Sequence, residues 1–165
     1  MKNIGCRCLA SEYGKVIINK CIKRQISLSN IKLQQLLIIT QGVMLASYHK
    51  PIFTEQVTGA SYGLLLKEVN KDFFGIFEFN EEYFAYVVPL DIEIQVIDKV
   101  LNRYGQLDPF QLKELPEMKK LYKTLQHFNF DVSSNMENCI FESVFKNNIV
   151  VYEVNLEKDY NKLSM

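Results

Sequence analysis

The pattern of apolar and polar positions is most distinctive between residues 29 and 48, where apolar side chains cover almost every side of an expected helix. Lys32 is the only charge in this stretch, and its glutamines recur at helical spacing. A helix that is apolar nearly all round is expected to lie buried at the centre of a domain. Ser29 is expected to cap it and Pro51 to end it. A strand through the β-branched run 37–40 is the alternative, but the length of the pattern favours a helix.

Weaker amphipathic patterns predict further helices on both sides of this central one. They cover residues 11–23, 64–74, 89–104, 110–115 and 118–126. Ser11 and Asp108 are suitable N-caps, and Pro109 suits a first helical position. The chain is therefore expected to be mainly helical.

Between residues 76 and 88 the apolar period changes to two. Segments 76–79 and 83–88 flank Asn80-Glu81-Glu82, which predicts a β-hairpin. A two-stranded ribbon packs one face on the helices, and its other face is either covered or offered to a partner. The aromatic residues of this hairpin are the candidate partner-binding residues, with plain core packing as the alternative: Phe77, Phe79, Tyr83, Phe84 and Tyr86.

Two interpretations are open for the last part of the chain. Residues 133–141 can form a helix, or segments 139–145 and 149–154 can pair across Lys146-Asn147-Asn148. The run Ile149-Val150-Val151-Tyr152 favours the hairpin, because β-branched and aromatic residues suit strands. Residues 155–165 are polar and are expected to fray.

These elements predict a mainly α (α+β) fold. A compact helical domain surrounds the central buried helix, with a small β-hairpin and a second hairpin near the C-terminus. Residues 1–127 are expected to form the helical domain, and residues 128–165 an extension packed on it or flanking it. The length of 165 residues suits one core of this kind.

Charge and composition narrow the classes of function. Lys plus Arg and Asp plus Glu number 19 each, so the net charge is zero, which argues against nucleic-acid binding as the main activity. A neutral chain has weak colloidal protection, so a partner or a homo-oligomer is compatible with it. The first ten residues lack the apolar core of a signal peptide, and no stretch reaches the ~20 apolar residues of a membrane span. The sequence therefore predicts a cytoplasmic protein without a membrane partner.

The cysteines are expected to be free thiols in that compartment: Cys6, Cys8, Cys21 and Cys139. The single residue between Cys6 and Cys8 is too short a gap for usual zinc spacing, so no metal site is expected. The chain contains neither a P-loop nor a G-x-G-x-x-G motif, and no cofactor is expected.

One motif resembles a catalytic one. Gly59-Ala60-Ser61-Tyr62-Gly63 matches the G-x-S-x-G elbow that exposes the nucleophile of α/β-hydrolases. Such a triad needs an acid and then a histidine downstream, and His127 is the only histidine there. The chain also lacks the alternation of strands and helices that builds the hydrolase sheet. A serine hydrolase acting through Ser61 therefore stays a weak alternative to a glycine-lined turn, where the backbone passes close to another element.

The stretch SNIKLQQLLIITQG followed by PIFTEQVTGASYG resembles the Panacea domain, also called the SocA-like or phage-associated domain. The resemblance spans residues 13 to 125, including VIDKVLNRYGQLDPFQLKEL. The chain departs from the family pattern at Gly59-Ala60, where the family has A-W, and at Leu64-Leu65 and Pro116-Glu117. The motif residues that match include Ser29, Lys32, Leu33, Gln34, Gln41, Gly42, Tyr62 and Gly63.

The resemblance implies a non-enzymatic interaction protein. Panacea domains act as antitoxins, and they occur in phages and prophages. It implies a protein partner, either a toxin or a host defence factor, and neutralisation that can involve delivery to a protease. An inhibitor of a host defence protein, encoded by a phage, is the alternative within the same fold. Residues 128–165 and the aromatic hairpin are the candidate segments that choose the partner.

Overall fold

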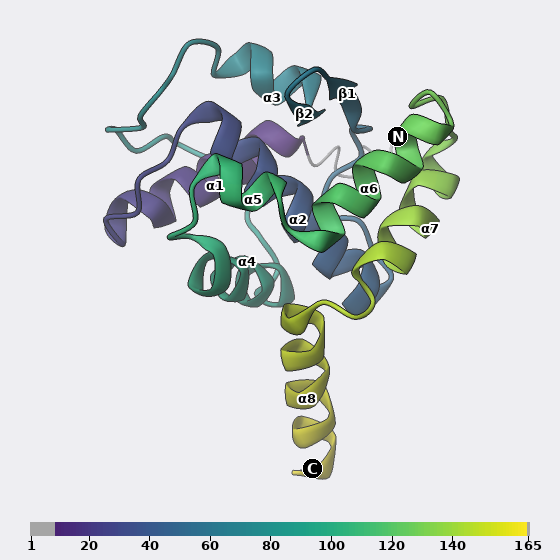
Figure 1. The fold of residues 1–165 in the computed structure, drawn as a ribbon. Helices are drawn as coiled ribbons and strands as arrows, with labels where there is room; N and C mark the ends of the chain where they lie inside the picture. Colours follow the sequence, from purple (N-terminus) through teal and green to yellow (C-terminus); the bar gives the residue numbers. More distant parts are fainter. Residues whose placement is uncertain (1–8, 165) are drawn as a thin grey trace, which may run out of the picture.

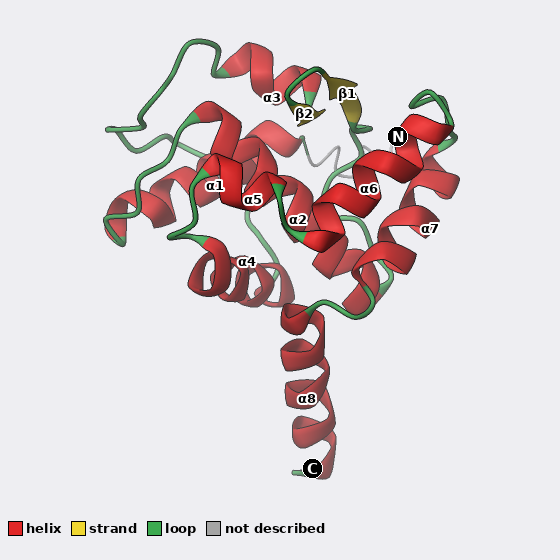
Figure 2. Ribbon diagram, in the orientation of Figure 1, coloured by secondary structure: helices red, strands yellow, loops and turns green. Residues whose placement is uncertain are grey.

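The computed structural model describes residues 9–164 and confirms the mainly α class (Figures 1 and 2). The described chain forms eight helices and one small antiparallel sheet. The helices are α1 (Ala10–Lys23), α2 (Asn30–Tyr48), α3 (Lys67–Asp72), α4 (Asp91–Tyr104), α5 (Pro109–Lys113), α6 (Pro116–His127), α7 (Ser134–Phe145) and α8 (Ile149–Leu163). The strands are β1 (Thr58–Ala60) and β2 (Gly63–Leu65).

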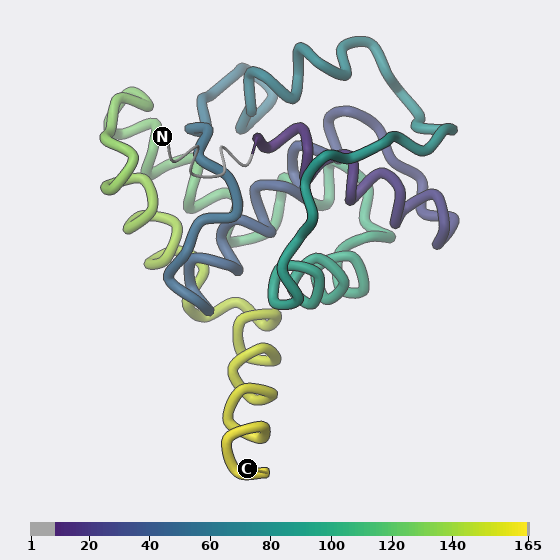
Figure 3. The backbone as a smooth tube through the Cα atoms, turned by 180° about the vertical axis from the view of Figure 1, so that it is seen from behind, coloured from purple at the N-terminus to yellow at the C-terminus, as the bar shows by residue number. Residues whose placement is uncertain are grey.

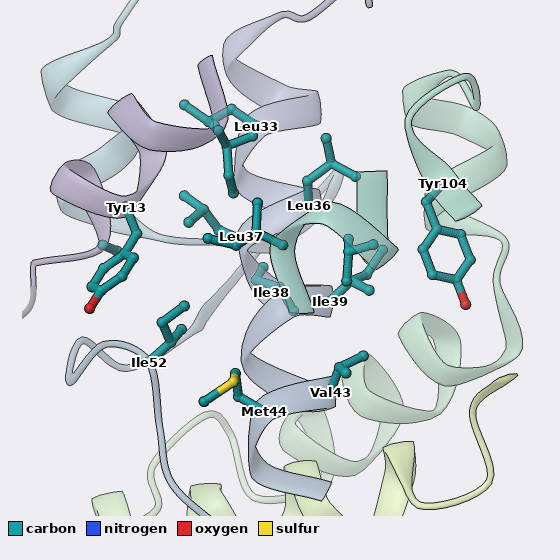
Figure 4. Close-up of a cluster of buried hydrophobic side chains, with 14 of the residues drawn as sticks. Tyr13, Leu33, Leu36, Leu37, Ile38, Ile39, Val43, Met44, Ile52 and Tyr104 are labelled. Atoms are coloured by element: carbon teal, nitrogen blue, oxygen red, sulfur yellow. The ribbon is translucent and has the colours of Figure 1, made fainter. Parts of the chain in front are cut away.

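Helix α2 lies at the centre, as its apolar pattern predicts, and contacts α1, α3, α4, α5, α7 and α8. Its side chains point outward in several directions into the surrounding core, toward Tyr13 of α1, Ile52 after α2 and Tyr104 of α4 (Figure 4). Each large apolar side chain that is buried stabilises the fold by about 1.5–3 kcal/mol. Because nearly all of α2 is buried, this one helix supplies a large share of that stabilisation.

The expected caps of α2 and α5 are present, but the expected cap of α1 is wrong. Ser29 Oγ accepts from Lys32 N at 3.2 Å at the start of α2. Ser11 instead lies inside α1 and donates to Asp72 at 2.5 Å. The first backbone N–H group of α1 has a partner far along the chain: Ala10 N donates to both carboxylate oxygens of Glu55 at 2.9 Å. A cap that comes from 45 residues away leaves no local sequence signal.

The hairpin predicted over residues 76–88 is wrong. Residues 74–90 form an irregular segment that runs across α1 (Figure 3), and we call it the aromatic segment. Its backbone pairs with other parts of the chain: Asn19 of α1 bonds both Tyr83 N and Tyr83 O, at 2.8 and 2.7 Å. Phe79 N donates to Leu28 O at 2.8 Å. A period of two indicates extended backbone but does not identify its hydrogen-bond partner.

The sheet forms earlier, at residues 58–65. Strand β1 pairs with β2 with Thr58 opposite Leu65, so the helix predicted to begin at residue 64 begins at Lys67. The expectation that the backbone passes close to another element at this turn is confirmed. A Cβ atom placed on Gly59 would lie 2.3 Å from the ring of Phe130, so a larger residue fits there only if that ring moves.

The hairpin preferred for the end of the chain is also wrong. Residues 155–163, for which the sequence predicts fraying, continue a helix. Helices α7 and α8 form there, with Ser133 and Asn148 as N-caps that accept from Met136 N and Val150 N. Asn148 is buried and donates to Tyr104 Oη at 2.8 Å, which fixes the corner between the two helices. The β-branched valines at the start of α8 are buried against the core, and this packing overrides their preference for strands.

Most of α8 projects away from the remaining helices (Figure 1). No helix of residues 9–164 is long and apolar enough to cross a membrane. Cys21 is buried and Cys139 is exposed, and both are free thiols. Cys6, Cys8 and most of the first ten residues lie outside the described part of the chain.

Helix α7 is held against α2 at Gly42. A Cβ atom at Gly42 would lie 2.4 Å from the ring of Phe145, whereas one at Gly14 of α1 would lie 3.5 Å from Leu33, an ordinary contact. We expect Gly42→Ala to destabilise the protein by about 1–3 kcal/mol through overpacking. The matched variant Gly14→Ala should be neutral or stabilising by up to about 1 kcal/mol, because alanine favours a helix. Urea unfolding of both variants tests this, and equal effects would contradict the packing at Gly42.

A buried carboxyl joins α7 to the segment before β1. Glu137 is 4 % exposed, and its Oε1 accepts from Val57 N at 3.0 Å. Burial raises the pKa of Glu137 from about 4.5 to about 7, although the bond from Val57 opposes the shift. Between about pH 4.5 and 7, Glu137 is therefore protonated in the folded state and ionised in the unfolded chain.

The contribution of Glu137 to stability is fully present below about pH 4.5 and is lost as the pH rises through about 7. Glu137→Gln keeps an acceptor oxygen and has no charge to bury. At pH 8 the variant should be more stable than the parent by about 1–3 kcal/mol, and the gain should shrink toward zero at pH 4. Urea unfolding at both pH values measures it, with the exposed Glu82→Gln as control. A gain that does not depend on pH would contradict the assignment.

Candidate functional site

Three of the α2 residues that match the Panacea pattern, Lys32, Gln34 and Gln41, are buried polar groups that hold irregular segments in place. Lys32 is 5 % exposed, and its ammonium donates to Ser27 O at 2.8 Å and to Gly105 O at 2.6 Å. Gly105 is the C-cap of α4, where the helix dipole favours a positive charge. Burial lowers the pKa of Lys32. This lysine ties the entry of α2 to the end of α4.

Two glutamines further along α2 also bind backbone groups of irregular segments. Gln34 Oε1 accepts from Leu66 N at 3.0 Å, while its Nε2 donates to the side-chain oxygens of Asn30 and Asn70. Gln41 Oε1 accepts from Ile52 N at 2.7 Å and from Phe53 N at 3.3 Å. Gln41 Nε2 donates to Phe53 O at 2.9 Å, so one side chain satisfies three backbone groups of the turn after α2.

The remaining motif residues are structural as well, with one exception. Ser29 caps α2, Leu33 is fully buried, and Gly42 contacts Phe145. Gly63 has a φ of +131°, a conformation that favours glycine. Tyr62 is the exception, because it is 47 % exposed in the turn between β1 and β2.

Ser61 lies in the same turn and not on a strand-to-helix elbow. It lines a pocket of about 260 Å³ together with residues of α2, α5 and α6. The described residues that line this pocket include three lysines and no histidine. None of these lining residues is therefore a histidine of the kind that a hydrolase triad uses.

The five candidate partner-binding residues divide into two groups. Phe77, Phe84 and Tyr86 are 87, 75 and 80 % exposed, and the rings of Phe84 and Tyr86 meet edge to face at 5.0 Å. Phe79 is buried and Tyr83 is partly buried, and both pack edge to face with Phe73. The buried pair anchors the aromatic segment and leaves the other three rings facing solvent.

Helix α1 also holds the backbone of the aromatic segment in place. Tyr86 N donates to Glu12 Oε1 at 2.6 Å, and Glu12 also pairs with Lys15 at 2.7 Å. Together with the bonds of Asn19, these contacts fix the segment at two points along α1. Phe74 and Val88 add to its exposed apolar surface, at 81 and 88 % exposure.

A second apolar surface lies on α8. Its exposed apolar residues recur every three or four positions, which places them along one side of the projecting helix. The buried residues Val150, Val151 and Val154 lie on the opposite side. The exposed stripe consists of Ile149, Tyr152, Leu156, Tyr160 and Leu163.

The sequence does not predict the pocket near Ser61, because its lining residues come from separate segments of the chain. Gln35 lines it from α2, and Met118 and Tyr122 line it from α6. The available signal was Gln35, a polar residue on a helix that is apolar nearly all round. Elsewhere in residues 9–164 no group of three or more His, Cys, Asp or Glu side chains is arranged to hold a metal ion. Burial raises the pKa of the Cys21 thiol to about 11, which keeps it protonated.

Comparison of the chain with protein-family models, with curated proteins and with solved structures finds no match. The resemblance to the Panacea domain therefore stays a prediction from the motif residues.

The bonds of Gln41 predict a large cost for its loss. Gln41→Leu leaves Ile52 N and Phe53 O buried without their partner, which should destabilise the protein by about 2–4 kcal/mol. Gln56 is exposed and donates to Val132 O, so Gln56→Leu, the same chemical change, should cost less than about 1 kcal/mol. Urea unfolding of both variants compares them. Similar losses of stability in the two variants would show that the bonds of Gln41 do not stabilise the turn after α2.

Proposed function

We propose that this chain is a non-enzymatic interaction protein, an antitoxin of the Panacea type that binds and neutralises a protein toxin. The observation that carries the proposal is the set of exposed rings on the aromatic segment, Phe77, Phe84 and Tyr86. The motif resemblance supports the class of protein. Delivery of the bound toxin to a protease is one way in which such binding neutralises it.

The exposed rings have the character of an interface. Aromatic side chains supply much of the binding energy at protein interfaces, and exposed apolar patches of this kind mark interaction sites. The backbone of the segment is already fixed on α1 by Asn19 and Glu12. Less conformational entropy is lost on binding when the contact surface is held in place beforehand.

The charge of the segment indicates what kind of partner it fits. Residues 74–90 contain Glu78, Glu81 and Glu82 and no Lys, Arg or His. Potentials across an interface are usually complementary. The partner therefore presents an apolar depression for the rings with a basic rim around it, as expected of a protein that itself acts on nucleic acid.

Affinity capture from the organism that encodes the chain, followed by mass spectrometry, identifies the partner. The captured protein is then expressed alone and together with this chain. Growth inhibition that is relieved by co-expression supports the antitoxin function. Recovery of a host defence protein that does not inhibit growth would instead favour the alternative of a phage-encoded inhibitor. Recovery of no protein partner would overturn the proposal.

Substitution within the aromatic segment tests where the partner binds. Phe84→Asp should weaken binding at least tenfold, because an exposed ring at the centre of an interface is replaced by a charge. Phe110 of α5 is 71 % exposed, and Phe110→Asp is the matched control that should leave binding unchanged. Titration calorimetry with the identified partner measures both variants, and circular dichroism checks their folding.

Charge reversal within the aromatic segment tests whether the partner surface is basic. Reversal of Glu81 and Glu82 to lysine should weaken binding, and the loss should diminish at high salt, where charges are screened. Asp131→Lys, on the exposed turn before α7, is the control for a reversal elsewhere. Equal effects of the two reversals would exclude a basic partner surface at the aromatic segment.

A further inference from the structure

The pocket beside Ser61 has walls from three parts of the chain. The start of α2 contributes Ile31 and Gln35, the strand turn and the start of β2 contribute Ser61 to Leu64, and α5 and α6 contribute the opposite wall. Its volume is about 260 Å³, which suits a small organic molecule. It shares no lining residue with the aromatic segment, so it is independent of the surface proposed for the partner.

Gln35 supplies an acceptor that has no partner. The residue is 7 % exposed, and its Nε2 donates to Pro109 O at 2.9 Å. That bond fixes the orientation of the amide, because a flipped amide would place its oxygen against a carbonyl oxygen. Gln35 Oε1 is buried and has no hydrogen-bond partner among the described residues. A buried acceptor without a donor is costly, and a ligand that brings an N–H or O–H group removes the cost.

The rim of the pocket is positively charged. Lys113, Lys119 and Lys123 line it together with a single acidic residue, Glu114. Glu114 pairs with Lys119 at 3.3 Å, while Lys113 and Lys123 form no ion pair with any described residue. Two exposed ammonium groups are thus available for an anion on the ligand.

The wall between these two ends is apolar and aromatic. Met118 and Leu64 are buried, and the partly exposed rings of Tyr62 and Tyr122 contribute the rest. Tyr122 Oη lies 3.5 Å from Ala60 O, which holds the α6 wall near the strand turn. Such a wall favours a flat, unsaturated ligand body.

From the buried acceptor, the apolar wall and the basic rim, we infer that this pocket binds a small aromatic anion that carries a hydrogen-bond donor at the end opposite its carboxylate. The donor reaches Gln35 Oε1, the ring lies among Tyr62, Met118 and Tyr122, and the carboxylate lies toward Lys113 and Lys123. Ser61 is a polar neighbour of this ligand and not a nucleophile.

The probe is 4-hydroxyphenylacetate, which has a phenol donor, a ring and a carboxylate in that order. Titration of the full chain, followed by amide chemical shifts, should give a Kd of about 0.1–1 mM, as expected for a ligand of this size. Phenylacetate lacks the donor and should bind about fivefold more weakly, since it leaves Gln35 Oε1 unpaired. Tyramine has an amine in place of the carboxylate and should bind at least tenfold more weakly, because it meets a rim of like charge.

Variants locate the binding within the chain. Lys113→Glu combined with Lys123→Glu should weaken 4-hydroxyphenylacetate at least fivefold and leave the fold intact, because both residues are exposed. Lys67→Glu together with Lys71→Glu, two exposed lysines of α3, is the matched control and should change the Kd less than twofold. Gln35→Met should make the probe and phenylacetate bind equally. Equal affinity of the parent for the three ligands, or shift changes away from Tyr62, Met118 and Tyr122, would overturn the inference.

Discussion

The fold depends on polar side chains that α2 carries into the core. A buried amide or ammonium group destabilises a protein unless hydrogen bonds satisfy it. Lys32, Gln34 and Gln41 are each 5 % exposed or less, and each bonds at least one backbone group of a segment that is neither helix nor strand. The same bonds satisfy the backbone of those segments, which lack a ladder of their own. The central helix therefore fixes the connections around it as well as the apolar core.

Helix α1 likewise carries side chains that bind the backbone of the aromatic segment. Asn19 and Glu12 occupy backbone groups of Tyr83 and Tyr86, while Phe79 and Tyr83 pack inward against Phe73. These backbone bonds, with Phe79 buried and Tyr83 partly buried, hold the segment without a strand partner. Its other rings can then stay exposed without loss of local order. This is how one stretch is both fixed in place and apolar on its outer side.

The sequence predicts this fold where the signal is local and fails where it is not. The length of α2, its cap at Ser29 and the proline that starts α5 each leave a pattern within a few residues. The cap of α1 is Glu55, and the partners of residues 76–88 lie on α1, far along the chain. At α8, burial of Val150, Val151 and Val154 outweighs their strand preference. The pocket beside Ser61 joins three distant segments, so only Gln35 gave a sign of it.

The roles of the motif residues limit what the Panacea resemblance can say about the partner. Nearly every matched residue on α2 stabilises the fold. Lys32, Gln34 and Gln41 form hydrogen bonds to the connecting segments, and Gly42 leaves room for the ring of Phe145. These roles are structural, so they carry no information about what the chain binds. The features that face solvent, namely the rings of the aromatic segment and the basic rim of the pocket, lie outside those α2 positions. Under the proposed function, partner choice falls to the aromatic segment, and α2 contributes by holding the fold that supports this segment.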